Sequence, residues 1–202
     1  MPGIGIVVLA AGRSTRFAAG RASKLLALVG DTALVRLAVS AALDAQVGEV
    51  VVITGDRADD VARSLVGLPA RIVREPQFAA GMATSLGRGV RELRAADAIM
   101  ITLGDVPDVH PEAYRRIAAR WQATGAAIVV PRYANATAPS HPTLFDSALF
   151  DELLELRGDV GARSIIARHA SVVVEEPMAW PAPRDVDTQA DLDEYVNTER
   201  TR

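Results

Sequence analysis

Apolar, largely β-branched runs recur along the chain and alternate with stretches of helical spacing. The apolar runs predict six strands, at residues 4–10, 49–54, 70–74, 98–103, 126–131 and 171–176. Most are almost continuously apolar, which is typical of strands covered on both faces. Helical spacing predicts five helices, at residues 32–46, 57–68, 84–93, 111–123 and 148–156. Because strands and helices alternate, the pattern predicts a doubly wound α/β fold with a mostly parallel sheet.

The ends of the predicted helices carry local signals. Asp31 precedes the first helix and predicts an N-cap, and Pro111 suits a first helical turn, where its missing N–H costs nothing. With no internal repeat, low-complexity segment or linker, residues 1–202 are expected to form a single domain. The tail after residue 196 is expected to fray.

Composition excludes several classes of function. The net charge is -3, so no basic nucleic-acid surface is expected, and the absence of cysteine excludes disulfides and thiolate metal sites. The first residues lack the basic flank and long apolar run of a signal peptide, and no apolar stretch is long enough to span a membrane. We therefore expect a soluble, cytoplasmic protein that binds neither nucleic acid nor membrane.

Lysine is used once in this arginine-rich chain. Of the 22 Lys and Arg residues only Lys24 is a lysine. Chance is one explanation. The other is a site that needs a compact ammonium, which the wide, planar guanidinium of arginine cannot replace.

The sequence "LAAGRSTRFAAGRASK" follows the first predicted strand. Its small residues allow a ligand to approach the backbone, whose N–H groups can form an anion nest, and Arg13, Arg16 and Lys24 add positive charge. This combination suits a polyphosphate. A tight turn with solvated arginines is the alternative, and the stretch contains neither a Walker motif nor a G-x-G-x-x-G motif.

Five segments together resemble the nucleotidyltransferases related to molybdenum cofactor synthesis, and most of all the cytidylyltransferase branch. They are "LAAGRSTRF" with the following "SKLLALVG", "GMATSL", "LGDVPDV", "SHPTLFDSALFDELLELRGDVGAR" and "RDVDTQADLDEY". The resemblance covers nearly the whole chain and implies a Rossmann-like fold. It also implies transfer of a nucleoside monophosphate from an NTP to a phosphate monoester, with release of pyrophosphate.

The resemblance assigns roles to individual residues. Arg13, Lys24 and Asp105 are implied to be catalytic, and Asp105 and Asp187 to bind Mg²⁺. The implied nucleotide-binding residues are Leu9, Ala10, Ala11, Gly12, Arg13, Lys24, Gly81 and Ser85. His141 and Arg163 are implied to contact the acceptor.

Each assignment has a structural alternative. Asp105 follows an apolar strand and suits a metal site at the sheet edge, but also a turn before Pro107. Asp187 precedes Thr188-x-x-Asp191, which forms a capping box. Asp185 suits a metal ligand, an outer-shell residue or a cap.

Similar alternatives apply to the segments implied to contact nucleotide and acceptor. The Gly81 segment also fits a helix that begins at Thr84, His141 also fits a surface loop, and "GDVGAR" also fits a plain helix–helix turn.

CTP and a molybdopterin-type acceptor are the expected substrates, and a molybdoenzyme or its insertion chaperone is a possible partner. The nucleotide prediction rests on Ala11, because the cytidylyl branch carries L-A-A-G where the guanylyl branch carries L-A-G-G. Two departures affect the acceptor side: Val106 stands where the family has Gln, and "ANATAPSHP" stands where it has glycines. The alternatives are a transferase acting on a sugar or polyol phosphate, and a non-catalytic carrier of a molybdenum cofactor.

Overall fold

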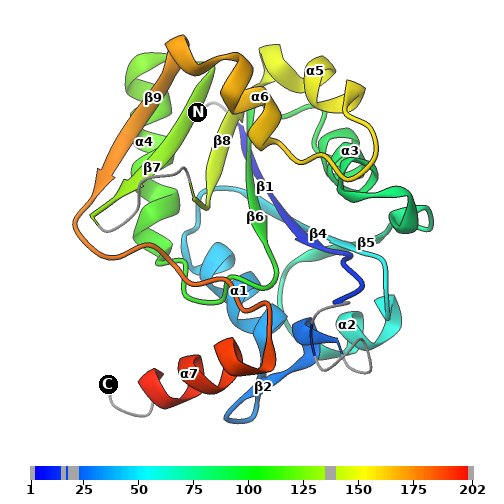
Figure 1. Ribbon diagram of the computed structural model, residues 1–202. Helices are drawn as coiled ribbons and strands as arrows, with labels where there is room; N and C mark the ends of the chain where they lie inside the picture. The colour runs from blue at the N-terminus through cyan, green and yellow to red at the C-terminus, as the bar shows by residue number, and fades with distance from the viewer. Residues whose placement is uncertain (1–2, 15–16, 18–22, 135–139, 200–202) are drawn as a thin grey trace.

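The computed structural model describes residues 3–14, 17, 23–134 and 140–199. Within these ranges a seven-stranded sheet has the order β5-β4-β1-β6-β8-β7-β9, with helices on both faces (Figure 1). Strands β5, β4, β1 and β6 are parallel, and so are β7 and β9. The doubly wound, mostly parallel sheet expected from the sequence is confirmed. The strands are β1 (Ile4–Ala10), β4 (Glu49–Thr54), β5 (Arg71–Arg74), β6 (Ala98–Leu103), β7 (Ile128–Tyr133), β8 (Thr143–Asp146) and β9 (Val173–Met178).

Strand β8 is the one strand of this sheet that the hydrophobic pattern did not predict. It lies antiparallel between β6 and β7, with Thr143 opposite Ile101 and Leu144 opposite Val129. It has four residues, so its apolar run is too short to stand out against the loop before it. Strands β6 and β7 are both antiparallel to β8, so they point the same way, and β8 lies between them.

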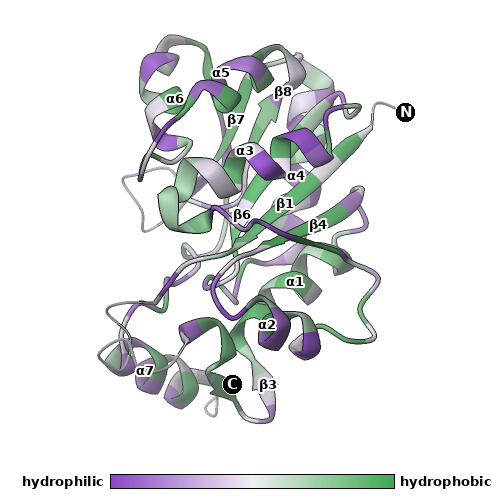
Figure 2. Cartoon of the chain, turned by 90° about the vertical axis from the view of Figure 1, so that its right-hand side faces the viewer, coloured by the Kyte–Doolittle hydropathy of each residue, from purple (hydrophilic) through white to green (hydrophobic). Residues whose placement is uncertain are grey.

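The helices form a layer on each face of the sheet. Residues of α1 (Leu34–Asp44), α2 (Ala58–Ser64) and α4 (Pro111–Thr124) share one apolar cluster with the sheet. Residues of α3 (Met82–Glu92), α5 (Phe150–Glu155) and α6 (Arg163–Arg168) share another. Figure 2 shows the apolar strands β1, β4 and β6 between helices that alternate polar and apolar faces. None of the helices in the described ranges is long and apolar enough to cross a membrane.

Helix α7 (Gln189–Glu199) lies outside these two layers, near the carboxyl ends of the central strands (Figure 1). Its Leu192 and Tyr195 form a third apolar cluster with Val186, Phe17 and Leu34 of α1. The segment that leads into α7 is therefore anchored at the edge of the sheet where ligands of open α/β folds bind.

Two predicted helix starts are wrong. Asp31 does not cap α1: it lies in the turn of a short hairpin, β2 (Leu28–Val29) with β3 (Thr32–Ala33), and Ala33 is the N-cap. Thr84 does not cap α3, because Gly81 occupies that position. In both cases a residue type that often caps helices stands near the start of the helix. At Asp31 the chain forms a hairpin turn instead, and at Thr84 the helix has already begun.

Helices α4 and α6 differ in how far the sequence predicted them. Pro111 begins α4 as predicted, and the His110 ring accepts a hydrogen bond from the Glu112 N–H at 3.2 Å. The short helix α6 was not predicted, because six residues are too few to show a helical period.

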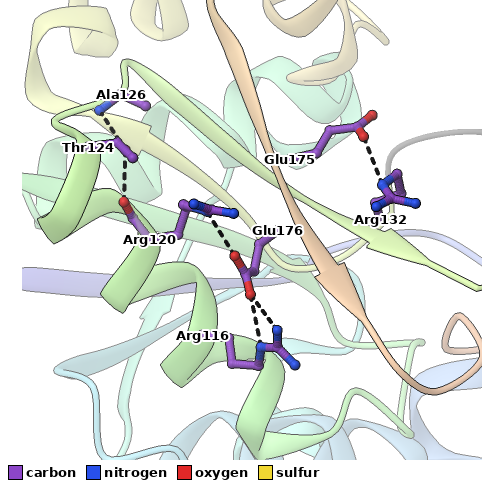
Figure 3. Close-up of polar contacts among 7 residues, drawn as sticks. All are labelled: Arg116, Arg120, Thr124, Ala126, Arg132, Glu175 and Glu176. Carbon is purple, nitrogen blue, oxygen red and sulfur yellow. Dashed lines mark hydrogen bonds and ion pairs between the residues drawn. The ribbon is translucent and has the colours of Figure 1, made fainter.

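Neighbouring glutamates on β9 hold it to its surroundings in two different ways (Figure 3). Glu176, 7% exposed, accepts hydrogen bonds from Arg116 Nε at 2.9 Å, Arg116 Nη2 at 2.6 Å and Arg120 Nε at 2.8 Å, all from α4. Glu175 points to the other face of the strand, where it pairs with Arg132 of β7 at 3.0 Å. That second pair is exposed.

We expect Glu176→Gln to lower the free energy of unfolding by about 1–3 kcal/mol, because it weakens several charge-assisted hydrogen bonds. The matched change Glu175→Gln should cost less than about 1 kcal/mol, since its ion pair is exposed. Urea unfolding followed by circular dichroism measures both. Equal losses for the two variants would contradict this prediction.

Candidate active site

A cavity of about 520 Å³ opens at the carboxyl ends of β1 and β6. Its walls come from the loop after β1, the turn before α3, the end of β6, the loop before α6 and the segment before α7. The structure therefore brings together loops that are far apart in the sequence. The residues expected at the nucleotide and metal sites that line it are Leu9, Ala11, Gly12, Arg13, Lys24, Gly81, Ser85, Asp105 and Asp187.

The loop after β1 forms one wall. A Cβ on Gly12 would meet no other atom within 4 Å, so this stretch of backbone faces open space that a ligand can occupy. Ser14 is nearly buried and has a φ of 52°, in the left-handed region that serine rarely adopts. Its Oγ accepts a hydrogen bond from the Lys24 N–H at 3.1 Å. The loop thus returns on itself and fixes the backbone of the lone lysine; Arg16 lies outside the described residues.

Lys24 lies between two carboxylates. Its Nζ is 2.6 Å from Asp187 Oδ1 and also forms an ion pair with Asp105 Oδ2. The Lys24 side chain is only 13% exposed. Burial by itself lowers the pKa of this ammonium, but the charges and hydrogen bonds of Asp105 and Asp187 outweigh that effect and raise it. The amine therefore stays charged at neutral pH.

The same two carboxylates fit a divalent metal ion. Both reach one position, which Lys24 Nζ occupies, and hard cations such as Mg²⁺ prefer oxygen ligands of this kind. Among the described residues, no group of three or more His, Cys, Asp or Glu side chains could hold a metal. Asp105 and Asp187 would therefore provide only part of a coordination shell, and substrate oxygens and water would complete it.

The capping alternative for Asp187 is resolved by its neighbours. Asp191 Oδ2 accepts hydrogen bonds from the N–H groups of Asp187 at 3.0 Å and Thr188 at 2.7 Å, and Thr188 Oγ1 accepts from the Asp191 N–H at 3.2 Å. The predicted capping box is confirmed. It uses the side chains of Thr188 and Asp191, so the Asp187 carboxylate remains directed at Lys24.

Asp185 stands just before these residues. Desolvation raises the pKa of its carboxyl, and the negative charge of Asp105 adds to that effect. It does not line the cavity.

Two of the resembling segments meet at the start of α3. Gly81 has a φ of 119°, and a Cβ there would lie 2.2 Å from the carbonyl carbon of Gly158. The Gly158 carbonyl accepts a hydrogen bond from the Ala83 N–H at 3.1 Å, and Asp159 Oδ1 lies 3.4 Å from the Met82 N. The "GDVGAR" loop therefore supports the first turn of α3, and Gly81 is required there because any side chain would collide with it.

Ala10 and Arg163 lie away from this cavity. Ala10 is 1% exposed and packs in the core between β1 and its helices. Arg163 instead lines a separate cavity of about 440 Å³ with Glu175 and apolar residues of α6. The Ala10 side chain therefore has no surface in the cavity of Lys24, and Arg163 lies outside that cavity.

His141 also lies outside the cavity. Its Nδ1 is 3.4 Å from the Ile101 carbonyl oxygen, and its own carbonyl accepts a hydrogen bond from Tyr133 Oη at 2.7 Å. Burial lowers the pKa of this ring, against the charge of Asp185, so the imidazole is neutral at pH 7.

Val106 was expected to bear on the acceptor. It is fully buried in the core, so its side chain has no surface to offer a substrate. The other departure, "ANATAPSHP", lies mostly outside the described residues.

Ser14, Phe78 and Asp159 are among the cavity residues to which the sequence assigned no role. Ser14 belongs to the motif that carried the resemblance, so its type was a signal. The Arg13 guanidinium carbon lies 5.7 Å from the centre of the Phe78 ring, which brings the loop after β1 to the turn before α3. Nothing in the spacing of Phe78 or Asp159 marked them.

The sequence profile of the MobA-like NTP transferase domain matches residues 6–172. This chain is a member of that family. The MobA-like chain is similar over 98% of both chains to the Mycobacterium tuberculosis rv0371c homolog from mycobacterium sp. strain JC1, with 28% identity and a TM-score of 0.85. It is similar over 99% of both chains to a nucleotidyl transferase from Methanothermobacter thermautotroptrophicus, with 26% identity and a TM-score of 0.81.

Curated relatives match the MobA-like chain over a shorter stretch. It is 32% identical over 126 residues to the bifunctional protein GlmU of Lactobacillus delbrueckii subsp. bulgaricus. The matched stretch covers 62% of this chain and 27% of that protein. It is 34% identical over 119 residues to the bifunctional IPC transferase and DIPP synthase of Rubrobacter xylanophilus, covering 57% of this chain and 26% of that protein. The chain thus spans about a quarter of the length of these two relatives.

Proposed function

We propose that this MobA-like chain is a nucleotidyltransferase. It joins the nucleoside monophosphate of an NTP to the phosphate of an acceptor and releases pyrophosphate. One observation carries the proposal: Lys24, Asp105 and Asp187 converge in a cavity whose wall is the small-residue loop after β1. Family membership and the nucleotidyl transferase among similar structures support it.

In the proposed reaction an oxygen of the acceptor phosphate attacks the α-phosphorus of the NTP. A new P–O bond forms, the bond to the β-phosphate bridging oxygen breaks, and pyrophosphate leaves with that electron pair. A phosphate monoester is already ionised at neutral pH, so no general base is needed. The contribution of the protein is positioning and charge stabilisation.

The cavity residues divide this work. Backbone at Gly12 and the exposed Arg13 bind the triphosphate, and Lys24 stabilises the charge that develops on the leaving pyrophosphate. We further propose that Asp105 and Asp187 hold Mg²⁺ when nucleotide is bound, which would orient phosphate oxygens and offset their charge. A complex of the similar protein Rv0371C from Mycobacterium Tuberculosis H37Rv with manganese, 29% identical with a TM-score of 0.82, supports a divalent ion in this fold.

CTP and molybdopterin are the proposed substrates, on the basis of the motif resemblance. The second candidate is a sugar or polyol phosphate acceptor. It is supported by the names of the two curated relatives, a GlmU and an IPC transferase. A non-catalytic carrier would bind ligands without releasing pyrophosphate.

A direct assay tests these proposals. The protein is incubated with Mg²⁺, each NTP in turn, and either a molybdopterin extract or a set of sugar and polyol phosphates. Pyrophosphate is measured by a coupled assay and the adduct is identified by mass spectrometry. No pyrophosphate with any pair would contradict the transferase function. Transfer to a sugar phosphate but not to molybdopterin would replace the acceptor and leave the reaction in place.

We expect Ala11→Gly to shift nucleotide preference from CTP toward GTP. Ala11 lines the cavity, and its methyl group restricts the space beside a larger purine base. A methyl-sized difference in a pocket is worth roughly 1–3 kcal/mol, so the ratio of kcat/KM for CTP over GTP should fall about 10–200-fold.

The matched control is Ala10→Gly, which removes the same group from the neighbouring position, where the methyl packs in the core. It should lower stability and leave the CTP/GTP ratio unchanged. The assignment of the base to Ala11 fails if the wild-type protein uses CTP and GTP equally well.

A further inference from the structure

The two segments that carry the Lys24 carboxylates run side by side and are tied together twice. The Val186 N–H donates to the Asp105 carbonyl at 3.2 Å. Further along, the Arg184 N–H donates to Asp108 Oδ1 at 2.9 Å and Arg184 Nε donates to Asp108 Oδ2 at 3.3 Å. Asp108 stands three residues after Asp105, and Arg184 stands three residues before Asp187. The Asp108–Arg184 pair therefore closes a short bracket behind both carboxylates.

Arg184 also connects this bracket to α7. Its Nη1 donates to Thr198 Oγ1 at 3.1 Å, and its guanidinium carbon lies 4.6 Å from the centre of the Tyr195 ring. Tyr195 is buried in the same apolar cluster as Val186. One side chain thus links the loop after β6, the segment before α7 and α7 itself.

We propose that Arg184 and Asp108 are positioning residues that set the separation of Asp105 and Asp187 around Lys24. This proposal rests on the proposed nucleotidyl transfer, and it gives a role to two residues to which the resemblance assigned none. Neither residue lines the cavity, so they act through the backbone. A displacement of about 1 Å in a catalytic group can reduce the rate about 10²-fold.

Burial distinguishes this pair from ordinary surface pairs. The side chains of Asp108 and Arg184 are 18% and 33% exposed, whereas those of the Arg132–Glu175 pair are 56% and 57% exposed. The planar guanidinium serves three contacts in fixed directions, which an ammonium cannot reproduce. A partly buried, multiply bonded pair can therefore fix a distance that an exposed pair would leave free.

The lone lysine provides a readout that does not depend on turnover. Acetic anhydride reacts with neutral amines, and Lys24 is the only lysine of the chain, so its acetylation can be followed by mass spectrometry of a single peptide. Contact with both carboxylates shields Lys24 from the reagent. Movement of Asp187 away from Asp105 would expose it.

The test compares Arg184→Gln with Arg132→Gln, a matched change at an exposed pair on β7 and β9. For Arg184→Gln we expect kcat to fall about 10–100-fold while KM for the nucleotide stays within about threefold, and Lys24 acetylation to become at least about fivefold faster. Arg132→Gln should change neither. Arg184→Lys should recover part of the loss, because it keeps the charge and the backbone contact to Asp108.

Asp108→Asn provides a second route to the same conclusion. If the pair acts as a unit, the double variant Asp108→Asn/Arg184→Gln should be no slower than the worse single variant. Rates are normalised to the folded fraction measured by circular dichroism.

The proposal is overturned if folded Arg184→Gln keeps the Lys24 acetylation rate of the wild-type protein, or if its kcat per folded molecule is unchanged. A wild-type protein that releases no pyrophosphate overturns the proposed function instead. In that case faster acetylation in Arg184→Gln, but not in Arg132→Gln, would still support the positioning role.

Discussion

Asp105→Asn and Asp187→Asn are each expected to reduce turnover at least about 10²–10³-fold while the protein stays folded. Each change removes one of the two negative charges that converge on Lys24, and it replaces one of the two anionic ligands proposed for Mg²⁺ by a neutral amide. Steady-state pyrophosphate release measures the effect, and thermal unfolding checks the fold. Asp105→Asn with wild-type activity would contradict the proposed metal site.

The capping box provides a matched control for Asp187. The side chains of Thr188 and Asp191 make the capping hydrogen bonds, so Asp187→Asn should leave stability nearly unchanged. Asp191→Asn should do the opposite: it should lower stability by about 0.5–2 kcal/mol and keep activity per folded molecule. If Asp187→Asn loses activity only in proportion to lost stability, its role is structural.

Lys24→Arg is expected to lose at least about 10²-fold in kcat although the charge is kept. The Lys24 side chain is 13% exposed and fills the gap between two carboxylates, where a compact ammonium fits and a wide guanidinium would push at least one carboxylate aside. Rapid-quench measurement of a single turnover separates this loss from slow product release.

Arg13→Lys is the matched control for this change. Arg13 is exposed at the mouth of the cavity, so the same exchange of cations in reverse should cost less than about tenfold. If Lys24→Arg equals the wild-type protein in rate and nucleotide affinity, the single lysine has no special role in the site.

Much of the fold was predictable because its central strands are long and apolar. The limits of β1, β4 and β6 agree with the predicted runs, and the topology rule for open sheets correctly placed the ligand cavity at their carboxyl ends. Strand β8 was missed because four residues carry too little periodicity.

The site was predictable only in part. Lys24 stood out by composition, and the resemblance assigned Asp105 and Asp187 to one metal site. The contact of Lys24 with both carboxylates was not predicted, because it depends on how the loops fold together. That Arg163 lines the separate cavity beside α6 was not predictable, because nothing in a loop sequence tells which side of a short helix its first residue faces. The bracket of Asp108 and Arg184 depends on two segments 76 residues apart, and a sequence pattern cannot show such pairing.

The position of β8 has a consequence for how the chain folds as it is synthesised. Strand β7 comes before β8 in the sequence, but in the sheet β8 lies between β7 and the central strands. Within the sheet, β7 is connected to the central strands through β8, with which it pairs at Ile128 and Val129. The strands β5, β4, β1 and β6 can pair as soon as residue 103 has been made. At about 5–20 residues per second, synthesis from the end of β7 to the end of β8 then takes roughly 1–3 seconds. During that time β7, which is largely buried in the finished protein, has no partner strand on the β8 side. An unpaired apolar strand is a feature of a nascent chain that both chaperones and aggregating neighbours recognise.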